Sequence, residues 1–144
     1  MAAMEARDLA LAHARGRMAV GAAFVLAPGM AGRFWIGDDA RRGAVKVVSR
    51  AFGARDLAIG LGVAIALDRG TPVRGWLEAG ALSDGLDFTA STLAGDSIPS
   101  GLRRFALALG GGSAALGVAL ARALDEPVGP DEVDAPEAAL TGHR

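Results

Sequence analysis

Four long apolar stretches, separated by short polar breaks, dominate the chain. They span about residues 9–27, 45–67, 73–93 and 102–124. Each has about 20 residues, lacks the alternation of apolar and polar residues found in strands, and is rich in Ala rather than Val, Ile and Thr. Strands usually have only about 3–10 residues. The pattern therefore predicts an all-α chain of four helices.

Residues that end helices mark the breaks between these stretches. Pro28-Gly29 ends the first stretch, because proline cannot continue a helix. Residues 68–72 separate the second and third stretches, and residues 95–101 separate the third and fourth. Because these connections are short, we expect neighbouring helices to pack antiparallel. Residues 33–36, Arg-Phe-Trp-Ile, have the composition of a segment at a membrane–water interface.

The last stretch lacks the polar stripe that a helix of a soluble bundle needs. From Phe105 to Ala121 its one polar side chain is that of Ser113, and residues 18–32 carry none. A helix that is apolar on all sides must be surrounded by protein or by lipid, and so few helices cannot surround one another fully. Glycines inside the helices also favour close helix contacts in a bilayer. The pattern predicts a four-helix antiparallel transmembrane bundle in residues 1–124, in a multi-pass protein of the cell membrane.

Two alternatives to this interpretation stay open. A soluble Ala-rich bundle would contain the same helices. The first stretch could also be a cleaved signal peptide, with Arg7, Arg15 and Arg17 as its basic segment. Glu5 and Asp8 interrupt that segment, and the cleavage pattern after it is poor. Basic residues are divided evenly between the two predicted sides, so the positive-inside rule does not orient the bundle.

Composition narrows the available chemistry. The 144 residues are 51% hydrophobic and 22% charged, with 21 Gly, no Cys and two histidines, His13 and His143. The lack of Cys excludes disulfides, thiol chemistry and Cys-ligated zinc, and two histidines make a multi-His metal site unexpected. We expect no metal or cofactor, and His13 is expected at the surface. The Ala, Gly and Arg bias is typical of GC-rich bacterial genomes, and the net charge of −1 gives no reason to expect a nucleic-acid partner.

Residues 125–144 differ from the rest of the chain. They contain six Asp or Glu residues, three prolines and a single Arg. A segment so acidic and so poor in large apolar residues cannot bury enough surface to offset the entropy of ordering it. We therefore predict a disordered acidic tail after the helical domain.

Charged residues inside the second and third predicted helices form the candidate site. Asp84 and Asp87 share one face of the third helix, and Asp56 lies on a face of small residues of the second. If these helices pack antiparallel about residue 70, Arg55 lies at the depth of Asp84 and can reach Asp84 or Asp87. One cation then faces three carboxylates, which cannot all be ionised in a low dielectric. Charged groups at membrane depth are usually paired or face a cavity.

Three interpretations of this cluster are open: an ion-pair network that joins two helices, a ligand or substrate pocket, and a proton-linked transport site. Glu78 belongs to the candidate set, but it lies about 120° from the Asp84 face and nearer the predicted membrane surface, where it would be solvated. A stripe of small residues on the last predicted helix would suit helix contacts, within the chain or between chains. Its members are Gly110, Ala114, Gly117 and Ala121.

Our leading hypothesis is a non-enzymatic accessory or interaction subunit. The sequence shows no nucleophile with a base, no metal-ligand set and no cofactor motif. Its expected partners are the bilayer and either a second copy or another membrane protein. The alternatives are a membrane enzyme of isomerase or cyclase type and a proton-coupled transporter. In the enzyme, Asp84 and Asp87 would be the acid/base pair and Arg55 a stabiliser of developing charge.

Several segments resemble a known group of proteins. They are Leu26-Ala27-Pro28-Gly29, Phe34-Trp35-Ile36-Gly37, the run from Arg50 to Gly62 with its Gly-Ala-Arg-Asp motif, and the run from Arg74 to Asp87 with its paired aspartates. Over about residues 15–124 they resemble the small, uncharacterised four-helix integral membrane proteins of GC-rich bacteria, which are distantly similar to DoxX-like proteins. The resemblance implies a four-helix membrane fold and draws attention to Arg55, Asp56, Asp84 and Asp87. It implies no reaction.

Overall fold

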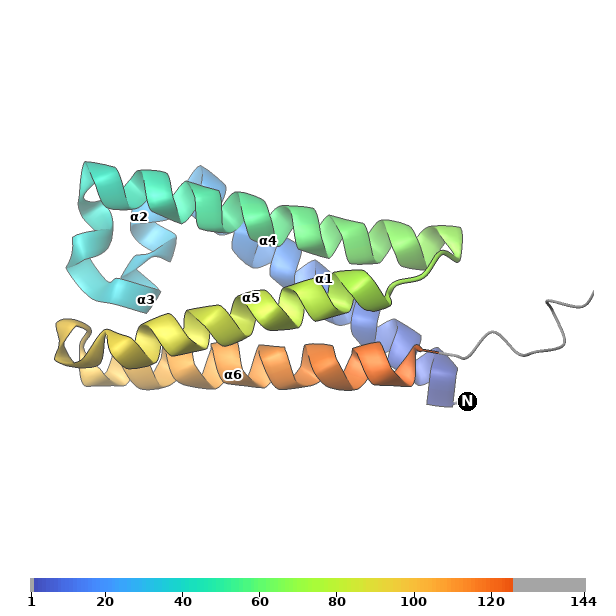
Figure 1. Ribbon diagram of the computed structural model, residues 1–144. Helices are drawn as coiled ribbons and strands as arrows, with labels where there is room; N and C mark the ends of the chain where they lie inside the picture. The colour runs from blue at the N-terminus through green and yellow to red at the C-terminus, as the bar shows by residue number, and fades with distance from the viewer. Residues whose placement is uncertain (1, 126–144) are drawn as a thin grey trace, which may run out of the picture.

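The computed structural model describes residues 2–125, and within this range the chain is helical and contains no strand (Figure 1). The all-α prediction is confirmed. Four of the helices are long: α1 (Ala2–Leu26), α4 (Gly43–Arg69), α5 (Arg74–Leu93) and α6 (Ser100–Ala123). Their bounds lie close to the predicted ranges, except that α1 begins well before residue 9. Residues 126–144, most of the predicted acidic tail, lie outside the described residues.

The early start of α1 has a local cause. Its first turns contain Ala, Met, Glu and Arg, which are good helix formers although they show no apolar periodicity. The Arg7 guanidinium also donates a hydrogen bond to the backbone carbonyl of Leu67 in α4. The periodicity marks only the part of α1 that packs against other helices, whereas propensity and this contact extend the helix beyond it.

The long helices form two closely packed pairs. α1 packs mainly against α4, and α5 packs mainly against α6, whereas the two pairs contact each other less. Successive long helices run in opposite directions, and α1 crosses the others at an angle (Figure 1). The sequence predicts that the second and third long helices pack against each other. Although a short turn joins α4 and α5, each has its main partner elsewhere.

Glycines permit the close approach within the first pair. A Cβ atom at Gly53 would lie 2.5 Å from the carbonyl oxygen of Gly21, and one at Gly60 would lie 2.8 Å from that of Ala14. Real Cβ atoms do not come so close to backbone oxygens, so α1 and α4 can pack in this way only with glycine at these positions.

The small-residue stripe of α6 has a similar role in the second pair. A Cβ at Gly117 would lie 3.1 Å from the Cβ of Ala81, and one at Gly110 would lie 3.3 Å from the carbonyl oxygen of Asp84. Both of these neighbours belong to α5. The stripe is therefore used for packing within the chain.

Short helical segments fold the chain back between α1 and α4. They are α2 (Pro28–Ala31), α3 (Arg33–Ile36) and the 3-10 turn η1 (Gly37–Arg41), and a second 3-10 turn, η2 (Gly95–Ser97), joins α5 to α6. Pro28 begins α2, and Gly37 has a positive φ of 72°, which favours glycine. This path brings α3 against α6 and places the Trp35 ring 5.9 Å from that of Phe52. Trp35 is therefore half-buried against Phe52, a contact that its predicted place at an interface did not suggest.

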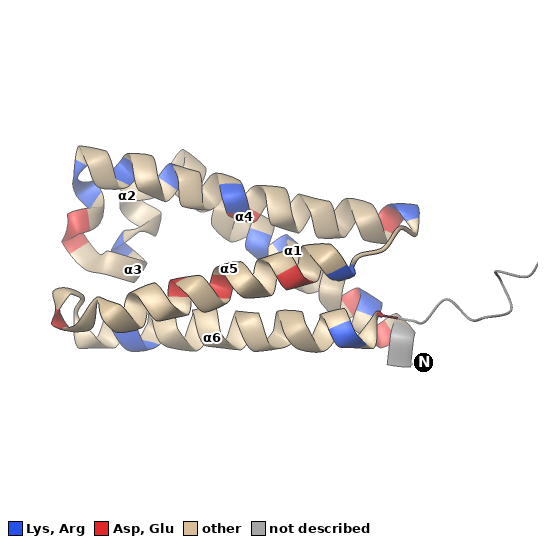
Figure 2. Cartoon of the chain, in the orientation of Figure 1, with Lys and Arg blue, Asp and Glu red and all other residues tan. Residues whose placement is uncertain are grey.

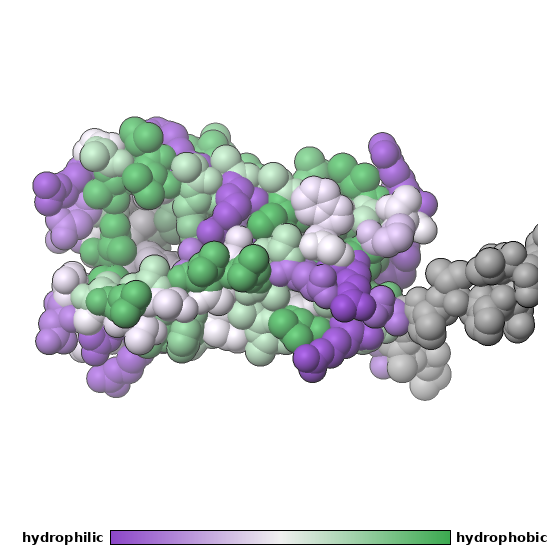
Figure 3. All heavy atoms as spheres, in the orientation of Figure 1, coloured by the Kyte–Doolittle hydropathy of each residue, from purple (hydrophilic) through white to green (hydrophobic). Residues whose placement is uncertain are grey.

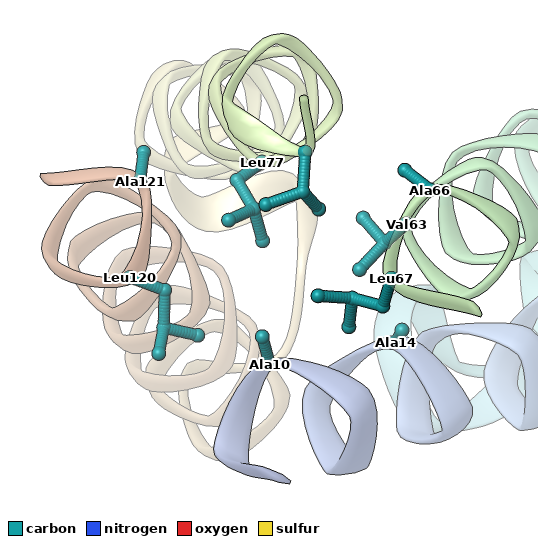
Figure 4. Packing of buried hydrophobic residues seen from close by; sticks show 9 residues of the cluster. Ala10, Ala14, Val63, Ala66, Leu67, Leu77, Leu120 and Ala121 are labelled. Carbon is teal, nitrogen blue, oxygen red and sulfur yellow. The ribbon is translucent and has the colours of Figure 1, made fainter. Parts of the chain in front are cut away.

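One end of the space between the two pairs is filled by a compact apolar cluster. All four long helices contribute to it, mostly with small or medium side chains, as Figure 4 shows. Its buried members are Ala10, Ala14, Val63, Ala66, Leu67, Val73, Leu77, Leu120 and Ala121. The cluster is the hydrophobic core that holds the pairs together at the end of the bundle where α4 turns into α5.

Two helices in residues 2–125 are long and apolar enough to cross a membrane, over Met4–Leu26 and Ser100–Ala123. Only 28% of each apolar stretch is buried within the protein. On the face shown in Figure 3, hydrophilic residues gather mainly toward the two ends, apart from a patch on α4. Helices α4 and α5 carry charged residues midway along their length, and these build most of the site described next.

Candidate functional site: a charge network between the helix pairs

Arg17 joins three helices in the middle of the bundle. From α1 its Nη1 atom donates a 2.9 Å hydrogen bond to Oδ1 of Asp56 in α4, and its Nη2 pairs with Oδ2 of Asp84 in α5. The same Nη2 lies 3.4 Å from the carbonyl oxygen of Gly80. The side chains of Arg17 and Asp56 are only 5% and 8% exposed, so this contact is screened little by water.

The fourth long helix reaches the same carboxylate. The Ser113 hydroxyl of α6 donates a 2.5 Å hydrogen bond to Oδ2 of Asp84. Asp84 therefore accepts hydrogen bonds from both helix pairs, from Arg17 of the first pair and from Ser113 of the second. This arrangement makes it the point at which the network connects all four long helices.

Arg55 forms the second half of the network. Its Nη2 atom lies 2.7 Å from Oδ2 of Asp87 and 3.3 Å from Oδ1 of Asp56. The guanidinium also lies 4.6 Å from the centre of the Phe52 ring, a cation–π distance. Its Nε atom is buried and has no hydrogen-bond partner among the described residues. We call Arg17, Arg55, Asp56, Asp84 and Asp87 the charge network.

Four of the five predicted candidates lie together in the charge network, midway along the helices (Figure 2). Arg55 pairs with Asp87, one of the two expected partners, while Asp84 pairs with Arg17 instead. Glu78 lies apart from the network. It is half exposed and pairs with Arg74 one helical turn away, at 2.7 Å.

Arg17 is the functional residue that the sequence interpretation missed. The sequence gives it a role only as part of the basic segment of the alternative signal peptide, yet it lies on the packed face of α1. A signal was present, because Arg17 shares helical spacing with the small or apolar residues of that face. These residues are Ala10, Ala14, Gly21 and Phe24, all buried. Arg17 also changes the charge balance, since two guanidinium groups rather than one now face three carboxylates.

Two neighbouring cavities adjoin the charge network. The larger has a volume of about 410 Å³, and the side chains of His13, Arg17, Asp56, Asp84, Asp87 and Ser113 line its polar part. The smaller, of about 240 Å³, is lined mainly by apolar residues, among them Phe24, Val45, Val48 and Ile98. Trp35, Phe52 and Asp87 line both. His13, expected at the surface, therefore faces the large cavity.

The geometry suits two tasks. Ion pairs from different helices hold the two pairs together, and removing one partner of such a buried pair leaves an uncompensated charge. Cavities beside charged groups can also hold a small molecule. Within the described residues, no three His, Cys, Asp or Glu side chains are placed to hold a metal ion.

No family model, curated protein or solved structure matches the chain. The resemblance to DoxX-like membrane proteins therefore stays a prediction from sequence.

Proposed function

We propose that the chain is a small multi-pass integral membrane protein in which α1, α4, α5 and α6 each cross the bilayer. The main observation that supports this proposal is the apolar composition of the outer face of α6. Its exposed residues from 105 to 119 are all apolar or glycine: Phe105, Ala108, Leu109, Gly112, Ala115, Val118 and Ala119. A surface of this kind is stable in hydrocarbon and unfavourable in water.

The two charged helices fit the same proposal. Large apolar side chains also point outward from α4 and α5, including Leu61, Leu82 and Leu86, which are 52%, 66% and 60% exposed. Asp56 and Asp84, at mid-helix, are buried and paired with Arg17. Charged groups of spanning helices are usually paired and face the bundle interior.

Within the membrane, the protein acts as an accessory or interaction subunit without catalytic chemistry of its own. The polar side chains of the charge network are engaged mainly with one another, within the α1–α4 pair and from that pair to α5, which supports a structural role for them. The exposed apolar faces of α5 and α6 offer contacts to lipid, to a second copy or to another membrane protein.

Single cysteines test the crossing of the bilayer cleanly, because the natural chain has none. We expect Asp68→Cys, at the end of α4, and Ser97→Cys, in η2, to react with a membrane-impermeant maleimide from opposite sides of the membrane. Ala115→Cys, midway along the outer face of α6, should react only after the membrane is dissolved in denaturing detergent. The readout is the mass-tagged fraction in intact cells and in inverted vesicles.

Two results would contradict the proposal. Reaction of Ala115→Cys in intact membranes, or recovery of the protein in the soluble fraction, would show that water covers the outer face of α6. Reaction of Asp68→Cys and Ser97→Cys from the same side would show that α5 does not cross.

A second candidate function is favoured by the cavities. Asp84 and Asp87 both line the large cavity, as a proton-coupled transporter or a membrane isomerase or cyclase would require. In either case a small molecule or ion must enter the space beside these carboxylates.

A further inference from the structure

The large cavity opens toward the outside of the bundle between α1 and α6. Its lining includes Val20 of α1 and Leu109 of α6, which are 37% and 44% exposed. From there it extends inward to Asp84 and Asp56. A molecule that moves along the apolar outer surface of the protein therefore has a path to buried carboxylates.

The carboxylates beside the cavity retain capacity to accept hydrogen bonds. Among residues 2–125, the hydrogen bonds to Asp84 reach only Oδ2, and those to Asp56 reach only Oδ1. The side chains of Asp84 and Asp56 are 10% and 8% exposed. Neither free oxygen, Oδ1 of Asp84 nor Oδ2 of Asp56, is fully enclosed by protein, so each can accept a hydrogen bond from a ligand that brings an N–H donor.

The charge balance points to the sign of that ligand. Two guanidinium groups, from Arg17 and Arg55, face three carboxylates, and α6 contributes only the neutral Ser113. With His13 neutral, one carboxylate is in excess. A bound cation can compensate this excess charge in place of a proton, whereas an anion would add to it.

The lining of the adjoining cavity indicates that the rest of the ligand is apolar. This cavity shares the lining residues Trp35, Phe52 and Asp87 with the large cavity, and Val45, Val48 and Ile98 also line its walls. A hydrocarbon chain or a ring fits such a lining, and the aromatic rings also favour a neighbouring cation.

We propose that these two cavities together bind a lipophilic primary ammonium ion, with its charged group at Asp84 and its apolar part beside Trp35 and Phe52. The proposal goes beyond an accessory role, and it is tested in detergent without any assumption about membrane crossing.

The fluorescence of Trp35 reports binding. Trp76 is the other tryptophan of the chain, and it lies outside both cavities, so Trp76→Phe serves as the background variant. Purified full-length protein is titrated with n-hexylammonium, 1-hexanol or hexanoate. We expect a saturable change with hexylammonium, at a Kd at least about tenfold below that of hexanol, because a charge-assisted hydrogen bond is lost in the alcohol. Hexanoate should not bind.

Two kinds of variant locate the site. Asp84→Asn should raise the Kd for hexylammonium at least about tenfold, because it removes the negative charge. If that variant fails to fold, the cavity-filling Ala108→Phe carries the test, since Ala108 lines the large cavity away from the charges. Ala119→Phe is its matched control, as it adds the same ring to an exposed position of α6 outside the cavity.

We expect Ala108→Phe to abolish binding and Ala119→Phe to leave it unchanged. Equal Kd values for hexylammonium and hexanol, or equal binding by the two Phe variants, would overturn the proposal. Repeating the titration in vesicles distinguishes the source of the ammonium group. Weaker binding in phosphatidylethanolamine than in phosphatidylcholine vesicles, which have the same net charge but no primary ammonium group, assigns the site to a lipid headgroup, and equal binding assigns it to a free amine.

Discussion

The interface inside each helix pair and the space between the two pairs are built in opposite ways. Inside the pairs, small residues let the helices approach until backbone touches backbone, as at Gly21 and Gly53. Between the pairs, only the end around Leu77 is closed by apolar packing, and the middle is bridged by Arg17 and flanked by cavities.

This contrast shows how each interface obtains its stability. Close packing gains many weak contacts that depend on the absence of a side chain, whereas a guanidinium spans a gap that packing leaves open. The same gap leaves room for a ligand. The space between the pairs is therefore the part of the fold where stability and binding depend on the same charges.

The largest effect should come from removing the bridge between the pairs. Arg17→Met leaves Asp56 and Asp84 buried without their cation, which should lower the free energy of unfolding by about 3–5 kcal/mol. Circular dichroism of the protein in detergent micelles, followed during denaturation, measures this loss. Arg15→Met is the control, because Arg15 is exposed two residues away and should change stability by only about 0.5 kcal/mol.

A compensating variant sharpens the same test. Combining Arg17→Met with Asp56→Asn and Asp84→Asn removes the uncompensated charge and should restore most of the lost stability. If Arg17→Met unfolds like Arg15→Met, the ion pairs do not hold the helix pairs together.

A smaller effect is expected from disturbing one pair alone. Gly53→Ala would place a Cβ 2.5 Å from the Gly21 carbonyl oxygen, so α1 and α4 must separate. Overpacking of this kind usually costs about 1–3 kcal/mol. Gly112→Ala is the control, because its Cβ would meet nothing within 4 Å, and its higher helix propensity should stabilise by up to about 1 kcal/mol. Thermal unfolding of both variants in the same detergent measures the difference. An equal loss of stability in Gly53→Ala and Gly112→Ala would contradict the packing role of Gly53.

The smallest effect should come from Glu78, the predicted candidate that lies outside the charge network. Glu78→Ala removes an exposed ion pair with Arg74, and such pairs contribute little in water. We expect an unchanged unfolding midpoint and unchanged binding of hexylammonium to the Trp76→Phe background. A loss in either measurement would place Glu78 in the site after all.

The sequence by itself determined the helices and most of the site. Apolar stretches of about 20 residues without alternation fix helical structure and its approximate limits locally. Helical spacing likewise puts Asp84 and Asp87 on one face, and equal depth about residue 70 predicts that Arg55 reaches Asp84 or Asp87, of which it pairs with Asp87.

Only the tertiary structure decided which helices pair and which cation meets which carboxylate. Arg17 is separated from Asp84 by 67 positions, and its role depends on α1 packing against α4 so that its side chain reaches across to α5. The fold-back that places Trp35 against Phe52 depends on the φ of Gly37 and on contacts of α3 with α6. Periodicity describes one helix at a time, whereas these contacts arise from how several helices share one interior.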